Sequence, residues 1–351
     1  MADDLPGLPA APVERWLRSV LPELIQEGPW SAEVISGGLS NITYRLRLPG
    51  GTVILRRPPL GHVLPRAHDM GREHRVLTAL FGTPVPVPET LALCTDPNVL
   101  GVTFYVMREV PGIVMRRPED TDALAPQARA ALADALVRSL ADLHAVDPDA
   151  VGLGDYGRRG DYGVRQIRTW AGQWERSKTR DLPDMEVLIK RLAESVPEDS
   201  GVAIVHGDFR LDNTIVGLAG QAPRIAVAPR IAAVLDWELS TLGDPLADLA
   251  VTLTYWHDRD DPERDKIPVS LGLTNKPGFP ASREIASAYA DRTGHDLGNL
   301  PFYMGLALMK LAVICEGVHA RYLGGRTVGE GYDRVGPAVP LLVARGLRTL
   351  G

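Results

Sequence analysis

Two kinds of hydrophobic periodicity follow one another along this chain. Between residues 30 and 110, apolar positions alternate with polar ones, and glycine or proline interrupts the runs. A period of two is typical of half-buried strands, so we expect this region to be mainly sheet. The turn Pro49-Gly50-Gly51 should close a hairpin. We also expect a helix at 12–29 and another at 69–81, which carries Glu73.

From residue 120 onward, apolar residues recur every three to four positions, which is typical of helices that bury one face. The expected helices lie at 126–146, 163–177, 184–195, 283–293 and 300–321, with short strands at 202–205, 214–216 and 231–235. We therefore predict an α+β chain with an N-lobe over 1–107, a hinge over 108–112 and a helical C-lobe over 113–351. A cleft between two such lobes is a natural place for a ligand.

Composition narrows the class of protein. The chain has 351 residues and a net charge of −6, and no basic tract indicates a nucleic-acid partner. Cys94 and Cys315 are its two cysteines, which excludes a disulfide framework and fits a reducing cytoplasm. The N-terminus is acidic and proline-rich, unlike a signal peptide, and no apolar run reaches the roughly 18 residues that span a bilayer. We expect a cytoplasmic monomer or homodimer without a membrane partner.

Polar side chains follow two short apolar runs late in the sequence. Asp208 and Asn213 lie five residues apart after the first run, and Asp236 follows the second. Phosphoryl transfer needs a carboxylate that holds the acceptor hydroxyl and cations that bridge the phosphates. Asp208 suits the first role, while Asn213 and Asp236 offer the oxygen ligands that Mg²⁺ prefers. Arg210 could reach the transferred phosphoryl group, or it could pair with an acidic neighbour such as Asp212.

The spacing Asp-x-x-x-x-Asn, followed by an aspartate at a later strand end, resembles the catalytic arrangement of protein kinases. The variant His206-Gly207-Asp208 is similar to the aminoglycoside phosphotransferase and choline-kinase-like branch of that fold. Segments 55–59, 71–77, 153–158 and 311–324 further resemble the kinase-like domains of acyl-CoA dehydrogenase family members ten and eleven. The resemblance implies a protein-kinase-like, two-lobe fold. It also implies ATP and Mg²⁺ as cofactors, and a small-molecule hydroxyl that accepts the γ-phosphate.

The resemblance also implies a role for each matching position. Asp208 would be the catalytic base with Arg210 beside it, and Asn213 and Asp236 would be the metal ligands. Arg56 would replace the lysine that grips the α/β-phosphates, although its broad fork is unlike a compact ammonium. The residues implied in nucleotide binding are Gly38, Ser40, Asn41, Arg56, its helix partner Glu73, Met107, Arg108 and Val110.

Several alternatives stay open at this point. The acceptor could be a hydroxylated acyl thioester or a related metabolite, an aminoglycoside antibiotic, or none, if the chain is a nucleotide-binding pseudo-kinase that acts through partners. The Arg56–Glu73 pair could be an ordinary surface ion pair. The glycines at 152–157 match a dinucleotide-binding pattern, but they follow an expected helix rather than a strand.

Other side chains have a structural and a functional interpretation. We expect His206, Asp244 and Asp248 to support the chain around Asp208 rather than to react. His257 and its acidic neighbours favour a solvated loop over a metal site. Core packing is favoured over an acceptor pocket for three tryptophans, which are Trp170, Trp174 and Trp256.

Overall fold

The structure is a computed structural model of the chain, and it describes residues 4–35, 41–60, 69–217, 229–326 and 331–351. The chain divides into two compact units. The first unit comprises Met1–Gly112 and Ala232–Ser240, and the second comprises Ile113–Ile231 and Thr241–Gly351. Gly38 and Ser40, which the sequence assigns to a phosphate-covering loop, lie outside the described residues.

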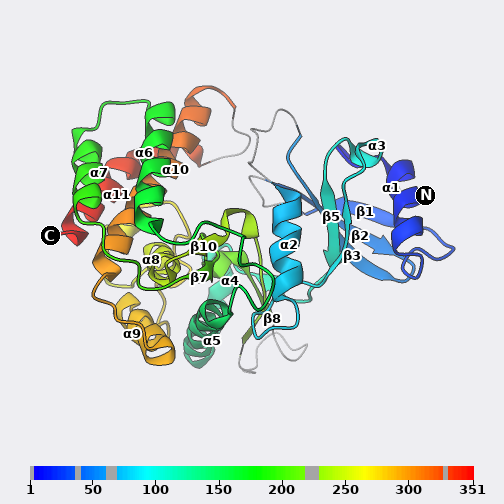
Figure 1. Ribbon diagram of the computed structural model, residues 1–351, viewed down its shortest axis with the longest axis horizontal. Helices are drawn as coiled ribbons and strands as arrows, with labels where there is room; N and C mark the ends of the chain where they lie inside the picture. Colours follow the sequence, from blue (N-terminus) through cyan, green and yellow to red (C-terminus); the bar gives the residue numbers. More distant parts are fainter. Residues whose placement is uncertain (1–3, 36–40, 61–68, 218–228, 327–330) are drawn as a thin grey trace. The chain divides into compact units, whose positions relative to one another are not determined.

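The first unit is built on a five-stranded antiparallel sheet with the strand order β1-β2-β3-β5-β4 (Figure 1). Its strands are β1 (Ser31–Val34), β2 (Ile42–Leu48), β3 (Gly51–Arg57), β4 (Thr90–Cys94) and β5 (Phe104–Arg108). The predicted hairpin is confirmed, because Leu48 pairs with Gly51 across the turn between β2 and β3. β4 was not predicted, and its register with β5 shifts between Thr90 and Ala92.

The helices of the first unit are α1 (Ala10–Val20), α2 (Met70–Leu80) and the short α3 (Pro97–Leu100). α1 ends at Val20 rather than at residue 29, and Pro22 lies just beyond its end, where a proline cannot continue a helix. Val13 and Leu17 of α1 are fully buried in one apolar core with residues of the sheet such as Leu55. α2 begins after Asp69, whose side chain accepts a hydrogen bond from the Arg72 N–H.

The second unit is mainly helical (Figure 1). Its helices are α4 (Pro118–Asp122), α5 (Pro126–Ala145), α6 (Tyr162–Ser177), α7 (Pro183–Glu194), α8 (Pro245–Tyr255), α9 (Ser282–Thr293), α10 (Leu300–Leu323) and α11 (Val335–Thr349). Its short strands are β6 (Ile113–Val114), β7 (Ala203–Val205), β8 (Thr214–Gly217) and β10 (Thr241–Gly243), which pair antiparallel as β6 with β8 and β7 with β10. β9 (Arg230–Val234) leads the chain from the second unit back into the first.

α10 packs against α6, α8 and α11 in the second unit (Figure 1). Among the described helices, it is the one that is long and apolar enough to cross a membrane by length and composition. The sequence-based expectation was that no apolar run is long enough to span a bilayer. Since 67% of its most apolar window is buried inside the structure, α10 has the environment of a core helix.

One late segment joins the first unit. The Val234 N–H donates to the Pro86 carbonyl at 2.7 Å, and the Trp237 N–H donates to Glu73 Oε1 at 3.3 Å. The Trp237 indole is buried and donates to the Val234 carbonyl at 3.0 Å. The sequence-based division instead assigned everything after residue 112 to the helical lobe. The difference arises because contacts with α2, rather than chain order, hold Ala232–Ser240.

Candidate active site

Arg56 lies between two carboxylates in the first unit. It extends from β3, where its backbone is paired with Tyr105 of β5. Its Nε donates to Glu73 Oε2 of α2 at 3.1 Å, and its Nη2 donates to Asp236 Oδ1. The side chains of Arg56 and Glu73 are 14% and 2% exposed. The surface-pair interpretation of Arg56 and Glu73 is therefore wrong, because β3 and α2 enclose both groups.

Burial and charge act in opposite directions on this cluster. Burial alone would lower the pKa of Arg56, but the carboxylates, Glu73 first, outweigh that effect and raise it. Burial raises the pKa of Glu73, while the adjacent guanidinium opposes that rise. The guanidinium is thus held as a buried cation that two acidic side chains share.

Asp236 has a left-handed backbone conformation with φ +68°, which is uncommon for a residue other than glycine. The following turn, η2 (Trp237–Leu239), is anchored by the Trp237 contacts with Glu73 and Val234. Asp236 is thereby fixed beside Arg56. Backbone strain of this kind persists only where surrounding contacts determine it, and it gathers at functional sites.

The other predicted nucleotide-binding residues of the first unit have different environments. Asn41 is buried, and its Nδ2 donates to Glu238 Oε2 at 3.0 Å, while its Oδ1 has no hydrogen-bond partner among the described atoms. Met107 is buried within β5. The Arg108 N–H already donates to the Glu89 carbonyl at 2.9 Å, so it is not free for an adenine ring. Val110 follows the end of β5 and is half-buried.

The second unit brings Asp208, Arg210 and Asn213 together. They follow β7 in a loop that continues into the turn η1 (Leu211–Asn213). Asn213 Nδ2 donates to Asp208 Oδ2 at 2.8 Å and to the Asp208 carbonyl at 2.9 Å. Arg210 Nε donates to the same Asp208 Oδ2 at 3.0 Å. One carboxylate oxygen is therefore held by two donors, and no hydrogen bond to Oδ1 is found among the described residues.

Arg210 forms the acidic pairing that the sequence left as an alternative. Its Nη1 donates to Asp212 Oδ2, and its guanidinium carbon lies 4.7 Å from the centre of the Tyr255 ring. Ser270 Oγ also donates to Asp212 Oδ2 at 3.0 Å. Burial alone would lower the pKa of Arg210, but Asp208 and Asp212 raise it. Neither Tyr255 nor Ser270 was predicted from the sequence, because each reaches Arg210 from a distant segment.

Asp248 fixes the backbone that leads to Asp208. Its two carboxylate oxygens accept from the His206 N–H at 2.5 Å and from the Gly207 N–H at 2.7 Å. Burial alone would raise the pKa of Asp248, but the hydrogen bond and charge of His144 outweigh burial and lower it. Asp244 caps α8 by accepting from the Leu246 N–H at 2.8 Å. The expected supporting roles of Asp244 and Asp248 are confirmed.

His206 supports the loop as expected. Its Nδ1 accepts from the Asp208 N–H at 3.2 Å, and its side chain is fully buried. Lys310 of α10 was not predicted, although it is the one charged residue in the apolar run from Leu300 to Cys315. Its Nζ donates to the Gly207 carbonyl. A lone lysine in a core helix is a sequence signal that can identify such a residue.

His257 is not part of a solvated loop, which corrects the sequence-based expectation. Its side chain is buried, with 1% exposed. Its ring Nδ1 accepts a hydrogen bond from the Gly272 N–H at 3.1 Å, and its backbone N–H donates to Thr274 Oγ1 at 2.7 Å. These bonds secure the loop that carries Ser270. Among the described residues, no group of three His, Cys, Asp or Glu side chains is arranged to hold a metal ion.

The glycine match at 152–157 lies in turns between α5 and α6, so the strand that a dinucleotide-binding motif requires does not precede it. A side chain on Gly157 would collide with Leu242 of β10, which explains this glycine by packing. Trp174 and Trp256 are buried, as core packing predicts.

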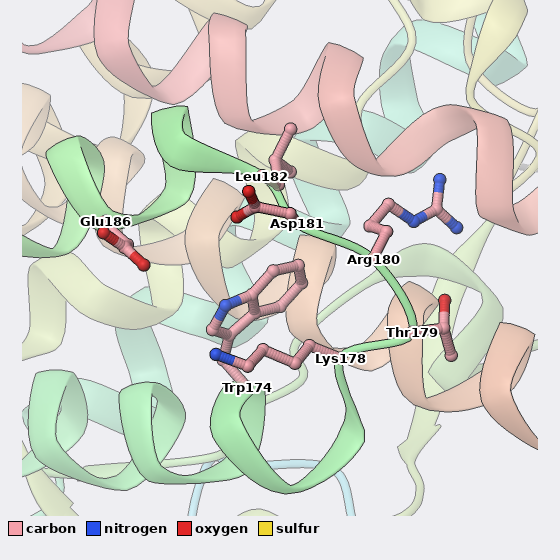
Figure 2. Close-up of a pocket in the computed structure, with 7 residues that line it drawn as sticks. All are labelled: Trp174, Lys178, Thr179, Arg180, Asp181, Leu182 and Glu186. Carbon is pink, nitrogen blue, oxygen red and sulfur yellow. The ribbon is translucent and has the colours of Figure 1, made fainter.

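Trp174 also borders a pocket of about 400 Å³ at the junction of α6 and α7, with Lys178, Asp181 and Glu186 around it (Figure 2). The remaining lining residues are Thr179, Arg180 and Leu182. The lining contains none of the predicted site residues.

Residues 31–281 match the phosphotransferase enzyme family. Acyl-CoA dehydrogenase family member 11 from Gallus gallus is 37% identical over 352 residues, which cover 95% of this chain and 42% of that protein. The chain thus spans less than half of the length of the curated relatives it matches.

Solved structures are similar over most of the chain. A "putative aminoglycoside phosphotransferase" from Ralstonia eutropha is 33% identical, with a TM-score of 0.80 over 97% of this chain and 98% of that one. A thermostable mutant of aminoglycoside phosphotransferase APH(4)-Ia, in a ternary complex with AMP-PNP and hygromycin B, is 18% identical with a TM-score of 0.60. The match covers 97% of this chain and 99% of that chain, and at this level of identity it supports the fold alone.

Proposed function

Because this chain belongs to the phosphotransferase enzyme family and has its protein-kinase-like α+β fold, we propose that it transfers the γ-phosphate of ATP, with Mg²⁺, to a small-molecule hydroxyl. The observation that carries the proposal is the Asp208 carboxylate. Asn213 and Arg210 hold its Oδ2, which leaves Oδ1 to accept a hydrogen bond from an acceptor hydroxyl. A positioned carboxylate of this kind orients the hydroxyl and takes its proton during phosphoryl transfer.

In this proposal the first unit binds the nucleotide. The Arg56 guanidinium would contact the phosphates, since arginine is permanently charged and its fork matches phosphate oxygens. Glu73 would fix the direction of the guanidinium, as their 3.1 Å contact suggests. Val110, just beyond β5, would offer its backbone to adenine, because the Arg108 N–H is already bonded to the Glu89 carbonyl.

Asn213 and Asp236 have donor atoms that fit Mg²⁺. Both hydrogen bonds of the Asn213 side chain use Nδ2, so Oδ1 is directed to neither partner. Arg56 contacts Oδ1 of Asp236, and Oδ2 has no hydrogen bond among the described residues. Mg²⁺ binds through one or two carboxylates, waters and phosphates rather than a full protein cage, so two protein oxygens suffice. When bound, the ion would offset charge on the phosphates.

We propose a hydroxylated acyl thioester or a related metabolite as the acceptor. Support comes from the names of the curated relatives, which are acyl-CoA dehydrogenase family members. An aminoglycoside is a polycation and requires an unpaired acidic wall. In the acidic segment 258–263, Asp261 is instead paired with Arg345 and Glu263 with Arg348.

Two measurements test the proposal. A screen of hydroxylated metabolites and acyl-CoA thioesters for ADP release should find an acceptor whose phosphorylation requires ATP. An expressing bacterial strain should stay sensitive to a panel of aminoglycosides, and resistance would instead assign the antibiotic-kinase alternative.

A nucleotide-binding protein that acts through partners is the second candidate, and Arg56 in place of lysine favours it. Slow ATP hydrolysis without acceptor, lost in Asp208→Ala, would exclude this second candidate.

A further inference from the structure

Lys310 places a cation beneath the loop that carries Asp208. Its Nζ donates to the backbone carbonyl of Gly207 and lies 5.4 Å from the centre of the Trp170 ring. Both contacts are formed inside the second unit, between α10, α6 and the loop after β7. A lysine at this distance from an aromatic face gains a cation–π attraction in addition to its hydrogen bond.

Gly207 is held from two sides by opposite charges. Its N–H donates to Asp248 Oδ1 of α8 at 2.7 Å, and its carbonyl accepts from Lys310 of α10. Gly207 has φ +82°, a conformation that glycine adopts without steric cost. The Gly207 carbonyl shares a peptide plane with the Asp208 N–H. Fixing that carbonyl therefore fixes the direction in which the backbone enters Asp208.

A charged donor at this position carries a cost that a simple packing role does not require. Burial lowers the pKa of Lys310, although the carboxylates of Asp208 and Asp248 oppose that change. A neutral donor could satisfy the Gly207 carbonyl with a smaller desolvation penalty. An ammonium gives a stronger, charge-assisted hydrogen bond and offsets the negative charge of the carboxylates around the loop.

We propose that Lys310 is a positioning residue that holds the Gly207–Asp208 peptide, so that the Asp208 carboxylate keeps its orientation toward the acceptor hydroxyl. This inference rests on the proposed phosphotransferase activity. Lys310 acts through the backbone of Gly207, and its contacts with Gly207 and Trp170 both lie within the second unit, whereas the residues proposed to bind the nucleotide belong to the first. Its removal should therefore lower the rate of transfer and leave nucleotide affinity unchanged.

Steady-state kinetics of three variants test this role. Lys310→Met keeps the apolar stem and removes the ammonium, Lys310→Arg keeps the charge, and Arg321→Met removes an exposed cation from the same helix as a matched control. Misplacement of a catalytic group by about 1 Å can cost on the order of a hundredfold in rate. We expect a loss of that order in kcat for Lys310→Met, an unchanged KM for ATP, and partial recovery in Lys310→Arg.

Two outcomes would overturn the proposal. One is a Lys310→Met enzyme whose kcat stays within about twofold of the parent and of Arg321→Met. The other is a loss of kcat that only follows the loss of folded protein, measured by the thermal unfolding midpoint, because that result assigns Lys310 to stability.

Hydrogen exchange of residues 203–213 gives a readout that needs no activity. The Asp208 N–H donates to His206 Nδ1, so its exchange reports how firmly the loop is held. We expect hydrogen exchange in this loop to be faster in Lys310→Met than in the parent, and to be the same in Arg321→Met as in the parent. If the parent neither hydrolyses ATP nor phosphorylates any acceptor, the proposed function fails. Unchanged exchange in Lys310→Met would still refute the positioning role separately.

Discussion

Arg56 and Glu73 form a buried ion pair in which β3 and α2 bring Nε and Oε2 to 3.1 Å. The guanidinium also contacts Asp236, so a single side chain links β3 and α2 to a segment that lies 180 residues further along the chain. This buried cation is costly to remove, because the Glu73 carboxylate, which is 2% exposed, would remain out of contact with water without its partner.

Replacing Arg56 should therefore destabilise the first unit. Arg56→Met leaves Glu73 buried without its cation, and breaking a buried pair from one side costs about 3–5 kcal/mol. Arg56→Lys should recover part of this loss, since one ammonium can contact Glu73 but cannot reproduce the fork. Urea unfolding measures the free energy, and Arg47→Met on the exposed end of β2 is the control. An Arg56→Met protein as stable as that control would contradict the structural role.

Asp236→Ala should weaken Mg-ATP binding. The substitution removes a proposed metal ligand and leaves Arg56 to pair with Glu73 alone, so the loss should depend on the metal. Titration calorimetry with ATP in the presence and absence of Mg²⁺ separates the two contributions. Tight binding that is equal under both conditions in Asp236→Ala would eliminate the metal assignment.

Asp208→Ala should sharply reduce phosphoryl transfer while nucleotide binding persists. General-base catalysis typically accelerates a reaction by about 10²–10⁴-fold, so we expect the rate of Asp208→Ala to be lower than that of the parent by a factor in this range. Asp291→Ala, at an exposed aspartate of the same unit, is a suitable control for the ADP-release assay. If Asp208→Ala turns over as fast as Asp291→Ala, another group is the base.

Stability should fall as the pH decreases through the range where histidine titrates. Burial, together with Arg264, lowers the pKa of His257, and the exposed Asp265 carboxylate opposes this effect. The unfolded chain then binds a proton at His257 near its ordinary pKa of about 6.5, before the folded chain does. The contribution of His257 to the free energy of unfolding is complete above that pH and is lost as the pH falls below it.

Measurements of the free energy of unfolding at pH 8, 6 and 5 give the slope of this free energy against pH. His257→Asn should make the slope shallower between pH 6.5 and 5. The remaining slope should reflect His74 and His295, whose pKa values burial also lowers. A slope identical to that of the parent would show that His257 binds its proton equally in both states.

The chemistry around Asp208 could be predicted because its signal is local. A short apolar run followed by Asp208 and Asn213 specifies a strand end and a turn, and the structure brings these two side chains within 2.8 Å. The contacts of Arg210 with Tyr255 and Ser270 could not be predicted, since they depend on how α8 and the loop after it pack. The contact of Lys310 with Gly207 depends on packing in the same way, although a lone lysine in an apolar run marks the residue itself as unusual.

Two elements show where local preference misleads. α11 contains Pro340 and two glycines, which argue against a helix, yet it forms one against α10 and α7. A side chain on Gly336 would collide with His319, and one on Gly346 would press against Leu188. The glycines thus permit close helix packing, and that packing outweighs their poor helix propensity. β4 was missed because its five residues lack a clear alternation.

The sheet-rich unit is assembled from two stretches of chain that more than a hundred residues separate. Glu73 accepts a hydrogen bond from the Trp237 N–H, but during synthesis it emerges from the ribosome long before Trp237. Domains tend to fold as units while translation proceeds at about 5–20 residues per second. We therefore expect this unit to wait several seconds for its last segment and to expose the α2 surface meanwhile. A nascent chain arrested before residue 232 should be more readily cleaved by protease than one arrested well beyond residue 240.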